Sequence, residues 1–217
     1  MPSPLHEVKV STKKAKFAIG CFWETDAIYG AQKGVIRTRV GYTGGKKIDP
    51  TYKDLGDHTE TIEIEYDPSE VTYDELLDTF WKSHDPTAKQ TLQYSSIIFY
   101  HDAEQKALAE KSLQEQSKKT SKPIQTKILP ITTFYDAEDY HQKYRLQQHP
   151  ILMKAINLES GPKVKSSHVA AKLNGYVVGR GGVAQYDKEV KKFGLDENTV
   201  KYVRDLVVKN EGRDLVC

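Results

Sequence analysis

The feature that most constrains this chain is the alternation of strand-length and helix-length segments over its first 158 residues. Ala15–Ile19 is a short apolar run that Gly20 ends, and from Cys21 the apolar spacing changes to that of a helix. The same alternation predicts strands at 35–42, 61–66, 94–100 and 124–129 and helices at 72–84 and 102–121. Short links between unlike elements predict a layered α/β or α+β domain.

The two ends of the chain differ from this pattern. Residues 1–14 form a polar leader, and residues 15–158 form the predicted domain. Residues 159–217 contain the glycine cluster NGYVVGRGG, an amphipathic helix expected at 196–210 and a tail that ends in Cys217. The glycine cluster lacks the GxxxxGK[ST] spacing of a phosphate-binding loop, so that function is disfavoured.

Composition excludes several classes of protein. The 32 basic and 30 acidic side chains leave a net charge of +2, which argues against nucleic-acid binding through bulk charge. Two cysteines are too few for a disulfide-stapled scaffold or a four-thiolate zinc site, and the histidines show no HExxH pattern, so no metal is expected. No run approaches the ~18 apolar residues of a membrane helix. The charged N-terminus is unlike a signal peptide, and we expect a cytoplasmic protein without membrane contact.

Cys21 is the first candidate for chemistry because it follows a strand and a glycine and opens a helix. A helix N-terminus presents unpaired N–H groups and partial positive charge, which stabilise a thiolate. Phe22 and Trp23 come next and are suited to wall a pocket for an apolar group. Position alone leaves two interpretations open, a reactive thiol and a small buried side chain.

Ordered motifs decide between these interpretations. They run along the chain from residue 20 to residue 142 as GCFW, VIRTRVGYTGG, PTY, HTE, YDP, FW, HDPT, QYS and FYDAEDYHQ. This series resembles the peptide-methionine sulfoxide reductase A family. The resemblance covers residues 15–145 and does not extend over 159–217.

The resemblance implies an α+β fold, a two-layer sandwich with a mixed, ferredoxin-like sheet flanked by helices, here with a helical C-terminal extension. It implies an oxidoreductase in which Cys21 attacks the sulfur of methionine (S)-sulfoxide, in proteins or as the free amino acid. Glu60 would protonate the departing oxygen, and Tyr52 and Tyr94 would donate hydrogen bonds to it. Phe22 and Trp23 would hold the substrate methyl group. Without the motif, Glu60 would be interpreted as an exposed acid on an alternating strand, like Glu63 and Glu65.

The same resemblance implies a second thiol that condenses with a sulfenic acid on Cys21. Cys217 would fill this role, and thioredoxin, or dithiothreitol in the test tube, would reduce the Cys21–Cys217 disulfide. We therefore expect no organic cofactor and a monomer. A terminal cysteine taken by itself would be an incidental surface thiol.

Two positions depart from the family pattern. Glu24 stands where the family usually has glycine, and it would either raise the pKa of the neighbouring thiol or point outward without effect. Lys89 stands where the family has a hydrogen-bonding aspartate, and Asp57 or Asp85 are the expected substitutes. Two other functions stay open: a cysteine hydrolase or acyl-transfer enzyme with His58 as the base, and a weakly catalytic interaction protein. His58 and His141 are otherwise expected to be structural.

Overall fold

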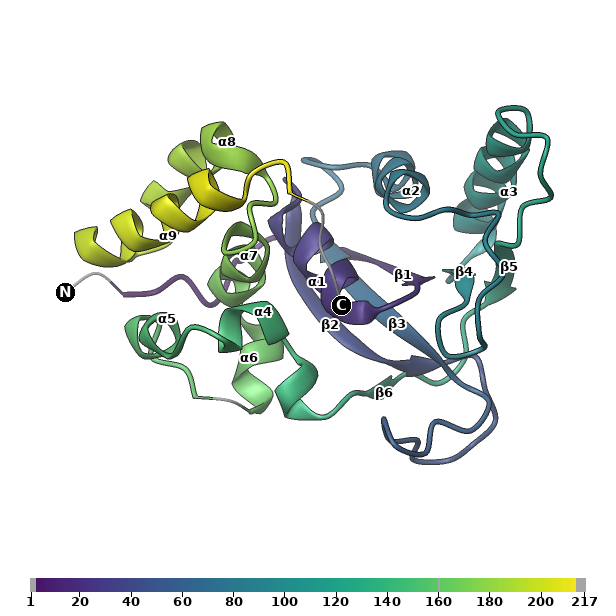
Figure 1. Ribbon diagram of the computed structural model, residues 1–217, viewed down its shortest axis with the longest axis horizontal. Helices are drawn as coiled ribbons and strands as arrows, with labels where there is room; N and C mark the ends of the chain where they lie inside the picture. The colour runs from purple at the N-terminus through teal and green to yellow at the C-terminus, as the bar shows by residue number, and fades with distance from the viewer. Residues whose placement is uncertain (1–2, 160, 214–217) are drawn as a thin grey trace.

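The computed structural model describes residues 3–159 and 161–213. The strands are β1 Lys13–Ile19, β2 Val35–Thr43, β3 Thr59–Tyr66, β4 Ser96–Tyr100, β5 Lys127–Pro130 and β6 Tyr135–Asp136. They form one mixed sheet in the order β5-β4-β1-β3-β2-β6, in which only the β4–β5 pair is parallel within the described chain. The predicted α+β fold is confirmed, and Figure 1 shows the curved sheet with its helices.

Three helices from the first part of the chain cover one face of the sheet. They are α1 Phe22–Ala31, α2 Tyr73–Lys82 and α3 Ala103–Ser117. Phe17 of β1 and Ile62 of β3 are fully buried there against Tyr29 of α1 and Phe80 of α2. A capping box at Thr72 begins α2, and the predicted Asp102 cap begins α3. The last residues of β2 and the first residues of β3 lie beside the start of α1, where Phe22 contacts Tyr42 and Glu60.

The other face of the sheet corrects one expectation. Glu63 was predicted to be exposed, yet it is 2% exposed because Lys16, Arg39 and Lys14 surround its carboxylate at 2.8–3.0 Å. Its pKa is lowered to about 2, since these partners outweigh the opposing effect of burial. Of the residues of β3, only Glu65 is partly exposed, and its carboxylate pairs with the Arg37 guanidinium at 2.9 Å. Alternation along β3 therefore separates an apolar face from an ion-paired face.

From Tyr144 onward the described chain consists mainly of helices. Its α-helices are α4 Tyr144–Gln147, α5 Pro150–Ala155, α6 Pro162–Ser166, α7 His168–Tyr176, α8 Gly182–Glu189 and α9 Glu197–Asn210. They share a core that includes Leu173, Tyr186 and Val203. Helix α7 lies against α1, as Figure 1 shows, and Gly30 makes this possible because a Cβ there would stand 2.3 Å from the Ala171 carbonyl oxygen.

The leader contacts this helical part. The Leu5 N–H donates to the Phe193 carbonyl, and the Val169 N–H donates to the Leu5 carbonyl, both at 3.0 Å. The N–H of His168 likewise donates to the carbonyl of His6 at 2.9 Å. The division of the chain at residues 14 and 158 stays a prediction. Across the described residues, no helix is both long enough and apolar enough to span a membrane.

Candidate active site

Cys21 lies at the N-cap of α1, where β1 turns directly into the helix. Gly20 makes this turn with φ +77°, a conformation that residues with a Cβ rarely adopt. The side-chain hydroxyl of Thr25 donates to the Cys21 carbonyl at 3.2 Å and supports the first turn. The sulfur of Cys21 is therefore held at the helix end where the dipole stabilises negative charge.

Glu60 lies next to this helix start on β3 and is 2% exposed. One carboxylate oxygen accepts the N–H of Phe22 at 3.0 Å, and the other accepts the side-chain amide of Gln93 at 2.8 Å. Burial raises the pKa of Glu60, and the bonds from Gln93 and Phe22 oppose this rise only in part. The structure thus places a carboxyl group with a raised pKa beside the residue that follows Cys21.

Tyr52 and Tyr94 meet at the same place from two different loops. Their side chains are close enough for Tyr52 to affect the pKa of Tyr94, and the amide of Gln93 lies 3.4 Å from the Tyr94 hydroxyl. Burial, the neighbouring Tyr52 hydroxyl and the charge of Glu60 raise the pKa of Tyr94 to about 12, so it stays a phenol near neutral pH. Gln93 was part of the QYS motif but carried no predicted role, and it links the acid to the phenols.

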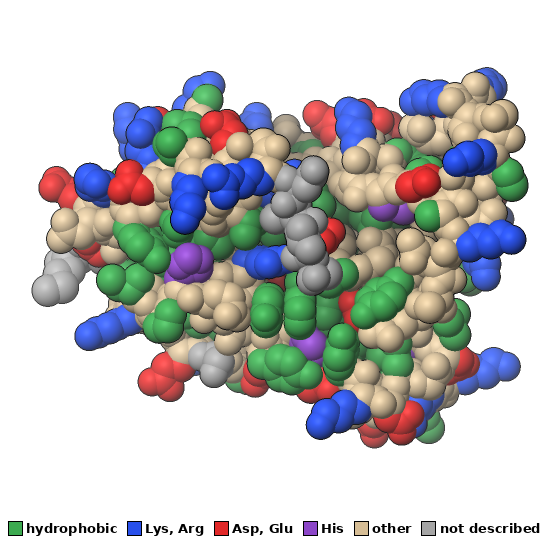
Figure 2. All heavy atoms as spheres, viewed as in Figure 1, with side chains coloured by type: hydrophobic (Ala, Val, Ile, Leu, Met, Phe, Trp, Pro, Cys, Tyr) green, Lys and Arg blue, Asp and Glu red, His purple; other side chains and the backbone are tan. Residues whose placement is uncertain are grey.

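Phe22 and Trp23 form the aromatic side of the site with two residues from the FYDAEDYHQ region and its continuation. The indole N–H of Trp23 donates to His141 Nδ1 at 2.9 Å, and its ring stacks on Tyr144 at 3.8 Å and 7°. Phe22 is buried, with its ring 5.0 Å from that of His141. Figure 2 shows hydrophobic side chains gathered at the centre of the face that carries the start of α1.

His141 is structural in the predicted sense, because it packs among these rings and is 1% exposed. Burial lowers the pKa of His141, so the ring is neutral near pH 7 and Nδ1 can accept the Trp23 proton. Tyr144 was missed by sequence reasoning, since it lies just after the last motif. Its only sequence signal is its place three residues after His141.

The prediction that Asp57 or Asp85 replaces the hydrogen-bonding aspartate of the family is wrong. Asp57 accepts the N–H groups of Lys46 and Lys47 at 2.8–3.0 Å, and Asp85 binds the N–H and hydroxyl of Thr87. Both acids are engaged in their own loops.

Glu138 is the second carboxylate that the structure brings to the aromatic cluster. It accepts the Tyr42 hydroxyl at 2.7 Å and the Tyr52 N–H at 2.9 Å. Burial tends to raise the pKa of Glu138, but these bonds and nearby His141 leave it lowered. Glu138 is therefore ionised near neutral pH, and its carboxylate holds the Tyr52 backbone in place.

The Cys–His alternative is not favoured. His58 is 1% exposed, and its Nδ1 accepts the Gly45 N–H at 3.2 Å while Nε2 lies 2.7 Å from the Lys47 carbonyl oxygen. Both ring nitrogens hold the 44–57 loop in place, and neither is available as a base for Cys21. His58 is structural, as expected.

Glu24 lies in the first turn of α1 and is half-buried. Burial raises its pKa, and the charges of Arg145 and Arg180 oppose that rise. Arg180 belongs to the glycine cluster of the C-terminal part. Glu24 therefore faces cationic residues, and its effect on the Cys21 thiol stays a prediction.

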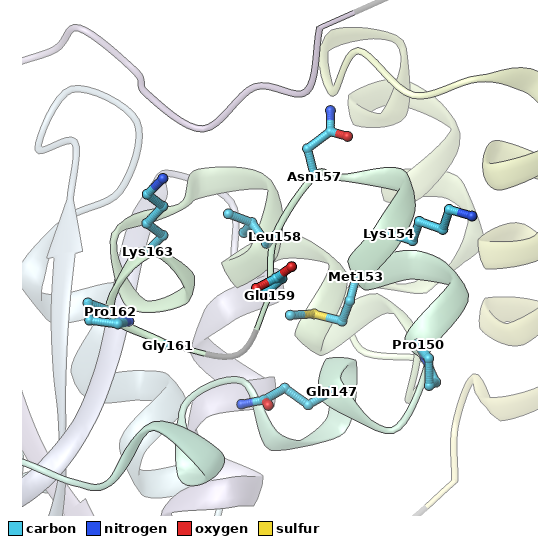
Figure 3. A pocket seen from close by; sticks show the side chains of 10 residues that line it. All are labelled: Gln147, Pro150, Met153, Lys154, Asn157, Leu158, Glu159, Gly161, Pro162 and Lys163. Carbon is cyan, nitrogen blue, oxygen red and sulfur yellow. The ribbon is translucent and has the colours of Figure 1, made fainter.

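A separate hollow lies away from these residues. A cavity of about 880 Å³ lies between α5 and α6, and Figure 3 shows Met153 and Glu159 approaching each other inside it. None of the candidate residues lines this cavity. In the described part of the chain, no group of three or more His, Cys, Asp or Glu side chains could hold a metal ion. Cys217, the predicted second thiol, lies outside the described residues.

A cysteine at a helix N-terminus, beside a buried carboxyl group with a raised pKa and two phenols, suits an enzyme that uses cysteine chemistry and protonates a departing oxygen. Comparison with known proteins gives the family. The model of peptide methionine sulfoxide reductase matches residues 13–174, and the helical-domain model of selenoprotein methionine sulfoxide reductase A matches residues 160–208. The chain belongs to the peptide methionine sulfoxide reductase family and is an oxidoreductase that acts on methionine sulfoxide.

Individual relatives agree with this assignment. A Drosophila melanogaster peptide methionine sulfoxide reductase is 47% identical over 99% of this chain and 88% of its own length. The A5 enzyme of Arabidopsis thaliana is 43% identical over 76% of this chain and 67% of its own. Among solved structures, methionine sulfoxide reductase A of Corynebacterium diphtheriae has a TM-score of 0.61 at 32% identity, covering 69% of this chain and 83% of that one. Reduced Mxr1 of Saccharomyces cerevisiae has a TM-score of 0.60 at 32% identity, covering 65% and 90%.

Proposed function

We propose that this protein reduces methionine (S)-sulfoxide, in proteins and as the free amino acid, with Cys21 as nucleophile and Glu60 as acid. The observation that carries the proposal is the bond between the Glu60 carboxyl and the N–H of Phe22, the residue after Cys21. This contact supports the proposal because it brings the Glu60 carboxyl next to the residue that follows Cys21. Repair of oxidised proteins would be the biological role.

The chemistry balances within these residues. The Cys21 thiolate attacks the sulfoxide sulfur while the Glu60 proton moves to the oxygen, because oxygen leaves poorly unless it is protonated. The attack forms a bond between Cys21 Sγ and the substrate sulfur. As this bond and the S–O bond break, the hydroxyl passes to Cys21 Sγ, methionine leaves, and Cys21 is left as a sulfenic acid. The proton first lost from the thiol replaces the one that Glu60 gives up.

Glu60 suits this step because its environment supports both of its protonation states. Burial favours the neutral acid before reaction, as the raised pKa indicates. Once the proton has left, the Phe22 N–H and the Gln93 amide already point at the two carboxylate oxygens. The developing charge therefore meets donors that need no reorientation.

The remaining side chains position the substrate. Tyr52 and Tyr94 would donate hydrogen bonds to the sulfoxide oxygen; the Tyr52 backbone is fixed by Glu138, and the Gln93 amide contacts the Tyr94 hydroxyl. Phe22 and Trp23 would hold the methyl group, with Trp23 fixed by His141 and Tyr144. An apolar wall with few polar groups is typical of small-ligand sites.

The second half of the cycle needs another thiol. We propose that Cys217 attacks the sulfenic acid, releases water and forms a disulfide with Cys21. Thioredoxin, or dithiothreitol in vitro, would then reduce this disulfide, so no metal or organic cofactor takes part. The sequence supports this proposal because it contains no cysteine besides these two.

The test is thiol mapping by mass spectrometry with one equivalent of each methionine sulfoxide epimer. We expect the S epimer alone to yield one methionine per enzyme and a Cys21–Cys217 disulfide. Cys217→Ser should still form one methionine but lose thioredoxin-driven turnover, and Cys21→Ser should lose both. Turnover with thioredoxin that survives in Cys217→Ser would overturn the resolving role, and methionine from neither epimer would overturn the activity.

Two further expectations stay proposals. We propose a cytoplasmic location. We also propose a monomer. Sedimentation of the purified chain and imaging of a tagged copy in cells would test them.

A further inference from the structure

A buried ion pair lies one helical turn beyond Trp23. The side chains of Asp26 on α1 and Lys143 are both 0% exposed, and Lys143 Nζ lies 3.1 Å from Asp26 Oδ1. The ammonium also donates to the Thr38 carbonyl at 2.6 Å, and the Thr38 hydroxyl donates to Asp26 Oδ1 at 2.6 Å. The pair therefore joins α1, β2 and the segment after His141.

The backbone of Lys143 is part of the same arrangement. Its φ is +51°, which is uncommon for a residue with a long side chain, and its N–H donates to Asp26 Oδ2 at 3.0 Å. The preceding Gln142 is anchored too, since its side chain bonds both the N–H and the carbonyl of Val40. Asp26 thus bonds the turn at the residue that has this uncommon backbone conformation.

The position of this turn sets the positions of His141 and Tyr144, which both contact Trp23. Gln142 and Lys143 bind the scaffold, while His141 and Tyr144 on either side of them contact the indole. His141 accepts its N–H at 2.9 Å, and Tyr144 stacks on its ring at 3.8 Å. A change in the turn would move both contacts together.

We propose that Asp26 and Lys143 are positioning residues that orient Trp23 through His141 and Tyr144. The inference rests on the proposed function, in which Trp23 holds the substrate methyl group. The pair does not reach the reacting atoms. We expect the ion pair to affect substrate binding. A displaced indole would contact the substrate methyl group less well in the ground state and in the transition state alike.

The fluorescence of Trp23 gives a reading that needs no activity. The chain has two tryptophans, so Trp81→Phe leaves Trp23 as the sole indole. In that background we expect Lys143→Met to shift the Trp23 emission maximum and to raise KM by ~10-fold or more, with kcat changed by less than about threefold. Asp26→Asn should do the same more weakly, since an amide oxygen can still accept the Lys143 N–H.

Lys172→Met is the matched control. Lys172 is also a buried lysine, 3% exposed, whose ammonium donates to the Gln32 carbonyl at 2.7 Å and pairs with Glu189. It lies on α7, and its hydrogen-bond and ion-pair partners among the described residues are Gln32 and Glu189, not His141, Tyr144 or Trp23. It should lower the unfolding temperature without moving KM or the emission.

If Lys143→Met folds poorly, the double variant Asp26→Asn/Lys143→Met replaces it, because that variant has no unpaired buried charge at this position. Its emission maximum and KM test the same prediction. Emission and KM that match the Trp81→Phe parent in the folded variants would overturn the proposal and leave the pair a purely structural element. Absence of sulfoxide reduction in the parent itself would instead count against the proposed function, while the emission still tests the positioning role.

Discussion

Replacement of Glu60 by glutamine is the perturbation that most directly tests the chemistry. The glutamine side chain would occupy the same buried space on β3, but it can donate no acidic proton. General acids contribute roughly 10²–10⁴-fold to rates, so we expect kcat to fall within that range. The substrate methyl contacts do not involve this position, and KM should change little.

The structure also sets the cost in stability. Glu60 accepts two bonds, from the Phe22 N–H and from the Gln93 amide, and a glutamine can accept with only one of its two terminal atoms. Unless the Gln93 side-chain amide rotates by half a turn, the new glutamine NH₂ group faces another N–H donor. Two unpaired donors lower the free energy of unfolding by about 1–3 kcal/mol. Such a loss lowers the unfolding midpoint without unfolding the protein.

The pH dependence separates an acid from a packing residue. Burial raises the pKa of Glu60, so the protonated, active form is lost as the pH rises through that raised pKa. The single-turnover rate of the wild type should fall on this limb, and Glu60→Gln should lack it. The folded state also binds this proton more tightly than the unfolded state. This group's contribution to stability is therefore full below its ordinary pKa and is lost as the pH rises through the raised value.

The assay is quenched single-turnover formation of methionine between pH 5 and 9, with Glu65→Gln as control. Glu65 lies on the same strand but on the opposite face, where it pairs with Arg37. A wild-type rate in Glu60→Gln, or a pH limb that the variant retains, would refute the assignment of Glu60 as the acid.

Two further predictions concern the phenols and the ion-paired face of the sheet. Tyr94→Phe removes one proposed donor to the sulfoxide oxygen, and we expect kcat to fall on the order of 10-fold while Tyr52 keeps part of the interaction; an unchanged single-turnover rate would make Tyr94 a packing residue. Glu63→Gln leaves Lys16 and Arg39 without their shared carboxylate, so urea unfolding should show a loss of about 3 kcal/mol at pH 7. Because the folded pKa of Glu63 is lowered to about 2, the wild-type advantage should be present above about pH 4.5 and disappear as the pH falls toward 2.

The sequence predicted most of the sheet because its strands and first helices carry strong local signals. Apolar periodicity, the Asp102 cap and the Asp67-Pro68 turn are readable within a few residues. The middle of the C-terminal part has no such signal. All nine residues of α7 are buried, so it shows no amphipathic stripe, and α4 to α6 are only four to six residues long.

The site was predicted in part for a related reason. Cys21 and its aromatic neighbours are adjacent in the chain, and the family motifs identify Glu60, Tyr52 and Tyr94. The contacts that hold them were not visible, because they join distant segments. Trp23 meets His141 across 118 positions and Asp26 meets Lys143 across 117. No spacing rule connects residues so far apart.

Glu60 and Glu63 show the limit most clearly. Both lie on β3, and both are 2% exposed, yet the pKa of Glu60 is raised and that of Glu63 is lowered. Because side chains alternate along a strand, three positions separate opposite faces. One face offers neutral donors beside α1, and the other offers the cations of β1 and β2. The chemistry of a carboxyl group in this protein is therefore set by which strand face it occupies and by the elements paired there.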